Sequence, residues 1–186
     1  VCSDAAAGAA RLADGGVLIV AVVDAAQTED VLFGVAGAGG AASALRAGHT
    51  VMLCPTIAPE DTELLAAGLA ERGIGCMDAP MSGGPARARD GSMSLMLAAP
   101  QALLARHADL LQALSSRRFV ISERAGDGAR TKLVNNLLAG INLVGAAEAL
   151  ALAERLGLDP GTTLDVIEQS SGQSWIGSDR MRRAIA

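Results

Sequence analysis

Residues 17–23 read VLIVAVV, an uninterrupted apolar run rich in β-branched side chains. A run of this length and composition predicts a strand that is buried on both faces, as strands in parallel sheets are. Asp24 follows at once and can cap a helix over residues 25–33, with Gln27 in the capping-box position. A buried strand that leads directly into a capped helix indicates an α/β fold.

The alternation of strands and helices continues along the first two thirds of the chain. Four more strands are expected, at residues 50–54, 75–78, 94–98 and 119–122. Pro59 opens a helix that ends near Gly73, and Pro100 opens another that ends near Leu114. Such an alternation predicts a parallel sheet with crossover helices.

After Gly126 the pattern becomes helical. Residues 128–156 favour one long helix without proline, and Gly157 stands where helices commonly end. The apolar side chains surround this helix, which predicts packing on several sides. We therefore expect a sheet domain over residues 1–126 and part of an all-α domain over residues 127–186.

Composition narrows the classes of function. The formal net charge is −5 and aromatic residues are 2%, which argues against nucleic-acid and anionic-membrane partners. Polar side chains within the long helix also argue against a membrane span: Lys132, Asn135, Asn136, Asn142 and Glu148. Three widely spaced cysteines and two histidines predict neither disulfides nor a metal site. No basic segment followed by an apolar run opens the chain, so we expect a cytoplasmic protein without a signal peptide.

One glycine pattern imitates a dinucleotide-binding loop. Gly37, Gly39 and Ala42 satisfy G-x-G-x-x-G/A as text. A phosphate-binding loop must leave a strand directly and open a helix, whereas a helix pattern stands between residues 17–23 and these glycines. We interpret this stretch as a turn.

A first candidate motif, DAPMSGGP, spans residues 78–85, directly after an expected strand. Ser82, Gly83 and Gly84 can direct backbone N–H groups and a hydroxyl toward an anion. Ligands of parallel sheets gather at the carboxyl ends of strands, where this loop would lie. The alternative is an ordinary strand-to-helix turn.

A second candidate motif is Gly126-x-Gly128-x-x-x-Lys132-x-x-x-Asn136. Lys132 and Asn136 are four residues apart and share one face of the long helix. Burial would lower the pKa of Lys132 and suit it to acid/base chemistry, and Asn136 can both donate and accept. The alternative is a partly solvated lysine whose ammonium reaches water.

Together the two motifs resemble those of the β-hydroxyacid dehydrogenase family, which combines a Rossmann-like domain with an all-α domain. The resemblance implies an NAD- or NADP-dependent oxidoreductase of small β-hydroxy acids such as 3-hydroxyisobutyrate, tartronate semialdehyde or threonate. By the same resemblance, Ser82, Gly83 and Gly84 hold the substrate carboxylate, Lys132 is the general acid/base, and Asn136 orients the substrate.

The resemblance also implies cofactor contacts at Val23, Asp24 and Thr56, although Thr56 could instead cap a helix start. Residues 25–34 and 172–175 are similar to the L-threonate dehydrogenase branch. The apolar long helix suggests a homo-oligomer formed through the helical domain.

The chain departs from the family's pattern at both ends. The N-terminal G-x-G-x-x-G unit and the later helices of the second domain are missing. We therefore expect residues 1–186 alone to lack activity. The alternative is a truncated, non-catalytic paralogue that acts as a dimerisation or small-acid-binding module.

Overall fold

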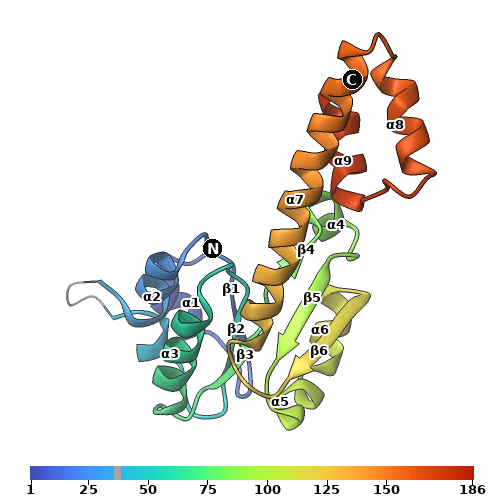
Figure 1. Cartoon of the computed structure of the whole chain (residues 1–186). Coiled ribbons are helices and arrows are strands. Elements are labelled where there is room, and N and C mark those ends of the chain that lie inside the picture. Colours follow the sequence, from blue (N-terminus) through green and yellow to red (C-terminus); the bar gives the residue numbers. More distant parts are fainter. Residues whose placement is uncertain (36–38) are drawn as a thin grey trace. The chain divides into compact units, whose positions relative to one another are not determined.

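The computed structural model describes residues 1–35 and 39–186 (Figure 1). The chain forms two compact units, Val1–Leu133 and Val134–Ala186. The first unit contains a six-stranded sheet, in which β1, β2, β3, β5 and β4 are neighbours in that order and β6 pairs with β5. The strands are β1 (Val17–Val20), β2 (Thr50–Leu53), β3 (Gly75–Asp78), β4 (Met81–Ser82), β5 (Ser94–Ala98) and β6 (Arg117–Ser122). The expected α/β fold is confirmed.

The apolar run at residues 17–23 forms a shorter strand than predicted. β1 ends at Val20, and Ile19 is 40% exposed. Burial on both faces was therefore the wrong prediction for β1, because Leu18 and Val20 pack into an apolar cluster on one face while Ile19 points to the opposite, less covered face. The prediction fits β2, which lies between β1 and β3 and whose four residues are all buried.

The sheet is rich in parallel pairs but is not all parallel. β1, β2 and β3 are parallel, as are β5 and β6, whereas β5 runs antiparallel to β3 and β4. A parallel return needs a crossover of a dozen or more residues. Between β4 and β5 the chain has only the short helix α4 (Gly84–Arg89) and a turn, so it comes back antiparallel.

Helices cover both faces of this sheet. Alternate residues of β2 point to opposite faces, so that Val51 belongs to one apolar cluster and Met52 to another. The first cluster includes residues of α1 (Ala5–Ala9), α2 (Ala25–Phe33), η1 (Ala41–Ser43) and α3 (Pro59–Ala70). The second includes residues of α5 (Gln101–Arg106) and α6 (Ala108–Leu114). The single helix expected from Pro100 to Leu114 is interrupted at His107, whose Nε2 lies 2.9 Å from the Thr50 hydroxyl.

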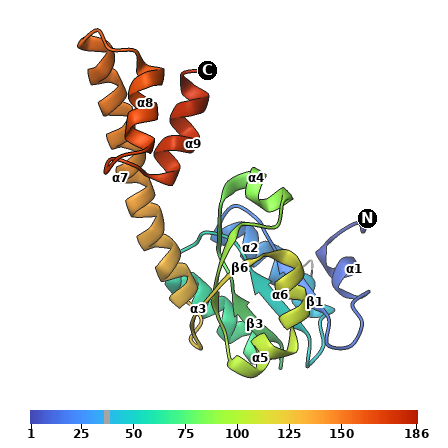
Figure 2. The ribbon, with the colours of Figure 1, turned by 90° about the vertical axis from the view of Figure 1, so that its right-hand side faces the viewer.

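The long helix α7 (Asp127–Arg155) begins in the first unit and continues into the second. There α8 (Pro160–Glu168) and α9 (Trp175–Ala184) run beside its later turns (Figure 2). Several apolar side chains of α7 are more than half exposed: Val134, Leu137, Leu138, Ile141, Val144 and Leu152. The prediction that α7 is packed on several sides is therefore wrong for this chain. Among the described residues, α7 is the one helix long and apolar enough to cross a membrane by length and composition.

Candidate active site

Asp78, the first residue of the DAPMSGGP motif, joins that motif to the start of α7. Its side chain is buried at the end of β3, and its Oδ2 accepts hydrogen bonds from the backbone N–H groups of Gly126 at 2.9 Å and Ala129 at 3.1 Å. Burial raises the pKa of Asp78, and these backbone hydrogen bonds oppose the rise. The two motifs recognised separately in the sequence are therefore one structural unit.

The two glycines of the second motif allow this close approach. Gly126 adopts a φ of +92°, which disfavours a side chain. A Cβ added at Gly128 would lie 2.8 Å from the carbonyl oxygen of Met96 and 2.9 Å from the carboxylate of Asp78. The G-x-G spacing thus serves a backbone contact between α7 and the strands β3 and β5, rather than a phosphate-binding turn.

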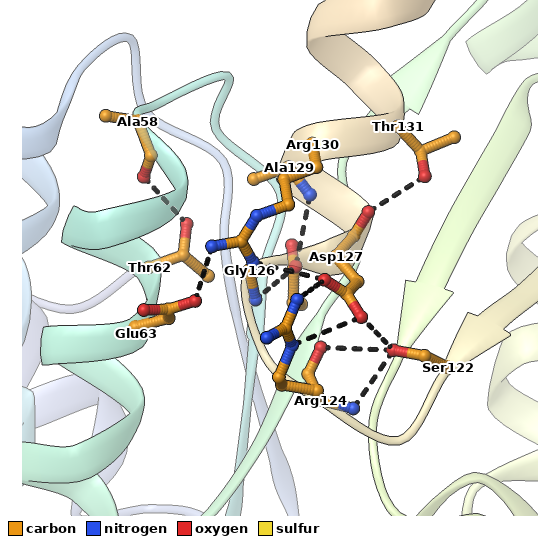
Figure 3. Close-up of polar contacts among 11 residues, drawn as sticks. Ala58, Thr62, Glu63, Ser122, Arg124, Gly126, Asp127, Ala129, Arg130 and Thr131 are labelled. Atoms are coloured by element: carbon orange, nitrogen blue, oxygen red, sulfur yellow. Dashed lines mark hydrogen bonds and ion pairs between the residues drawn. The ribbon is translucent and has the colours of Figure 1, made fainter.

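An outer set of ion pairs fixes the same turn of α7 (Figure 3). Arg130 bonds to Glu63 of α3 at 2.7 Å, and Asp127 bonds to Arg124 and to the hydroxyl of Ser122, both at 2.8 Å. The hydrogen bond from Arg124, followed by that from Ser122, lowers the pKa of Asp127 to about 2. The first turn of α7 is consequently held from the sheet side by Asp78 and from the outside by these charges.

Lys132 follows one turn later on α7. The residue is 8% exposed, and burial lowers the pKa of its amine. Among the described residues, none forms a hydrogen bond or ion pair with its ammonium group. Lys132 is also the only lysine among 15 cationic residues, the other 14 being arginines. This compositional signal, together with the role of Asp78, was missed in the sequence analysis.

The Ser-Gly-Gly segment forms the end of β4 and the turn into α4. Ser82 pairs with Ser94 of β5, and the carbonyl of Pro80 accepts a hydrogen bond from the N–H of Met96 at 3.0 Å. Gly83 and Gly84 have φ values of +138° and +66°, a backbone that other residues rarely adopt. The segment is thus a strand-to-helix turn whose conformation requires both glycines.

Comparison with known proteins places this geometry in a family. Residues 2–122 match the NAD binding domain of 6-phosphogluconate dehydrogenase. Residues 126–186 match the family described as NAD-binding of NADP-dependent 3-hydroxyisobutyrate dehydrogenase. The chain belongs to the β-hydroxyacid dehydrogenase family.

Individual members of this dehydrogenase family are similar over most of the chain. The L-threonate dehydrogenase of Cupriavidus necator is 41% identical over 165 residues, which are 89% of this chain and 54% of that protein. A crystal structure of 3-hydroxyisobutyrate dehydrogenase from Salmonella typhimurium superposes with a TM-score of 0.86 at 34% identity and covers 98% of this chain and 61% of that one. A structure of Psf3 in complex with NADP+ superposes with a TM-score of 0.87 at 27% identity, covering 99% and 63%. The chain spans about half the length of the curated relatives it matches.

NAD or NADP is the cofactor of this dehydrogenase family, and the contacts predicted for it lie after the carboxyl ends of β1 and β2. Val23 is 77% exposed and Thr56 is exposed, so an apolar and a hydroxyl side chain stand at one edge of the sheet. The carboxylate of Asp24 caps α2, accepting from the N–H of Gln27 at 2.8 Å. The alternative that Thr56 caps a helix is wrong, because the N-cap residue of α3 is Ala58.

Two further sequence expectations concern other places in the chain. Asn136 lies one turn beyond Lys132 on α7, in the second unit, and is exposed. In the glycine pattern near residue 40, Gly37 lies outside the described residues, whereas Ala42 lies in η1. The element that precedes this stretch is the helix α2, which ends at its C-cap Gly34, and not a strand. A dinucleotide loop would follow a strand, so the helix before this pattern agrees with its interpretation as a turn.

Proposed function

We propose that the protein transfers a hydride reversibly between the hydroxyl-bearing carbon of a small β-hydroxy acid and NAD or NADP, with Lys132 as the general acid/base. The observation that carries the proposal is the burial of Lys132 at its place on α7. It is the only lysine of the chain, it is buried, and it follows a helix turn that is fixed to Asp78. Because most lysines are exposed, a buried one without an ion-pair partner calls for a chemical reason.

Acid/base catalysis by Lys132 follows from its surroundings. Burial lowers the pKa of Lys132, so a larger fraction of the amine is unprotonated near neutral pH than in an exposed lysine. In the oxidative direction this amine takes the proton of the substrate hydroxyl, and in the reductive direction the ammonium returns it to the carbonyl oxygen. A nicotinamide, when bound, would accept or supply the hydride.

The remaining residues position the reactants. The hydroxyl of Ser82 and the turn at Gly83 and Gly84 hold the substrate carboxylate, and Asn136 orients the reacting hydroxyl. Val23, Asp24 and Thr56 line the cofactor. Residues 1–126 then belong to the NAD(P)-binding domain and residues 127–186 to an all-α domain, through which a cytoplasmic homo-oligomer assembles.

L-threonate is the substrate to test first, because an L-threonate dehydrogenase is 41% identical to this chain. The assay follows the absorbance of reduced nicotinamide with L-threonate or 3-hydroxyisobutyrate, using the natural gene product. Lys132→Ala should lower turnover by about 10²- to 10⁴-fold. Lys132→Arg should be similarly inactive, because a guanidinium does not release its proton near neutral pH.

Arg155→Ala, at the exposed far end of the same helix, should leave turnover unchanged. Near-normal turnover in Lys132→Ala would overturn the assignment of Lys132. A natural gene product that binds neither NAD nor NADP would favour the non-catalytic module instead.

A further inference from the structure

The carboxylate of Asp78 is a buried ionisable group that the proposed reaction does not use. Its residue is 1% exposed, and burial raises its pKa. A carboxylate in such a place is tolerated only where hydrogen bonds compensate for the lost water. Those of Asp78 come from backbone N–H groups at the start of α7, where the helix dipole also favours a negative charge.

The main chain of Asp78 ends β3 and leads into the Ser-Gly-Gly segment, while its side chain bonds to the start of α7. Backbone hydrogen bonds to β2 and to β5 fix the residues between Asp78 and Ser82. The N–H of Ala79 donates to Leu53 at 2.8 Å, and the carbonyl of Pro80 accepts from Met96. Any shift of the Asp78 side chain relative to α7 therefore changes the position of α7 against this segment.

Gly128 shows which face of α7 is involved. The space for its missing side chain is filled by the Asp78 carboxylate and the carbonyl of Met96. Lys132 lies four residues further along the helix and hence projects from the same face, one turn higher. The contact between Asp78 and the start of α7 thus sets both the position of Lys132 along the helix axis and the direction in which Lys132 points around that axis.

We propose that Asp78 is a positioning residue that fixes Lys132 at a set distance from the Ser82–Gly84 segment, where the substrate carboxylate binds. The proposal rests on the proposed function for its catalytic consequence. Asp78 itself touches neither substrate nor cofactor, and its effect passes through the first turn of α7.

Two variants disturb this contact from opposite sides. Asp78→Asn retains the shape and one acceptor oxygen but removes the charge. Gly128→Ala retains Asp78 and pushes the helix away, since its Cβ would stand 2.8 Å from the Met96 carbonyl. The matched control is Asp159→Asn, which alters an exposed cap of α8 whose carboxylate accepts from the N–H of Thr162 at 2.7 Å.

In the natural gene product, Asp78→Asn and Gly128→Ala should each lower kcat by about 10- to 100-fold, because small displacements of a catalytic group are costly. The KM for the nicotinamide nucleotide should stay unchanged in both, and Asp159→Asn should retain full kcat. Normal kcat in folded Asp78→Asn and Gly128→Ala would overturn the proposal. A loss of kcat that only follows the fraction of unfolded protein would do so as well.

A second readout does not depend on activity. Since Lys132 is the only lysine, the pH dependence of amine acylation in this chain reports its pKa directly, once the terminal amine is separated by peptide mapping. Gly128→Ala should expose Lys132 and raise its pKa toward the ordinary lysine value, so that the midpoint of acylation against pH moves to higher pH. An unchanged midpoint would refute positioning by this contact. If instead Lys132→Ala is fully active while Gly128→Ala still shifts the pKa, the proposed reaction fails and the positioning role stands.

Discussion

Replacement of Lys132 by methionine should stabilise the fold while it removes activity. The two side chains have similar length and volume, so the apolar packing of the lysine stem is retained. What is lost is the ammonium of a residue that is 8% exposed, an ammonium that has no partner among the described residues. Burial of an unpaired polar group costs about 1–2 kcal/mol in proteins. The melting temperature of Lys132→Met should therefore rise by about 2–8 °C for a chain of this size.

The matched control is Arg130→Met, which changes a cation two residues earlier on the same helix. Arg130 bonds to Glu63 at 2.7 Å and to Asp127 at 3.1 Å, so its replacement should lower the melting temperature. Both variants are compared with the unaltered chain by circular dichroism during heating.

The pH dependence adds an independent check on Lys132. Because folding lowers the pKa of Lys132, the unfolded chain binds its proton more tightly. Stability from this group should therefore increase as pH rises toward the ordinary lysine value of about 10.4, and Lys132→Met should lack that increase. A Lys132→Met variant that melts below the unaltered chain would refute the reasoning, because it would mean that the fold uses the ammonium.

Other measurements test neighbouring features. The pKa of Asp127 is lowered to about 2 from 3.8, so its contribution to stability should be full above 3.8 and disappear as pH falls through 2; Asp127→Asn should not show this loss in acid titrations. Burial, followed by the charge of Asp78, raises the pKa of Cys54 and Cys76 from 9.0 to about 12, so stability should decline between these pH values, and a double alanine variant should flatten the decline in denaturant titrations. Gly83→Ala should cost about 1–2 kcal/mol for its backbone alone and raise the KM for the hydroxy acid. Gly91→Ala, with a φ of +69° and open space for a Cβ, should show the backbone cost without the change in KM.

Local patterns predicted most elements of the fold. The strands at residues 75–78 and 94–98 and the helix at residues 25–33 occur where the sequence predicts them, because glycine and proline near the strands and a capping aspartate before the helix mark their ends. Their pairing was harder to predict. The antiparallel contact of β5 with β3 depends on the two-residue strand β4, which is too short to leave a periodic pattern. The interruption at His107 likewise coincides with a contact to Thr50, 57 residues away in sequence.

The candidate site shows the same division between local and distant information. Motif spacing was enough to select Lys132, Ser82, Gly83 and Gly84 as candidates. It could not indicate that Asp78 binds residues 126–129, because the partners are 48 and 51 residues away and no local period links them. A carboxylate that opens a loop motif normally suggests a cap of the next helix. Here it bonds to the start of a helix much later in the chain.

The distribution of cations gives a final argument for the chemistry. Arginine remains protonated in proteins, binds carboxylates in a bidentate fashion, and is well suited to ion pairs such as those of Arg124 and Arg130. A guanidinium cannot exchange a proton with a substrate near neutral pH, whereas a desolvated amine can. The chain uses arginine at 14 of 15 cationic positions and lysine at one. That one position is buried, lies next to a turn held by a buried carboxylate, and has no ion-pair partner among the described residues. We therefore propose that the need for a removable proton, rather than a structural demand, accounts for lysine at this position.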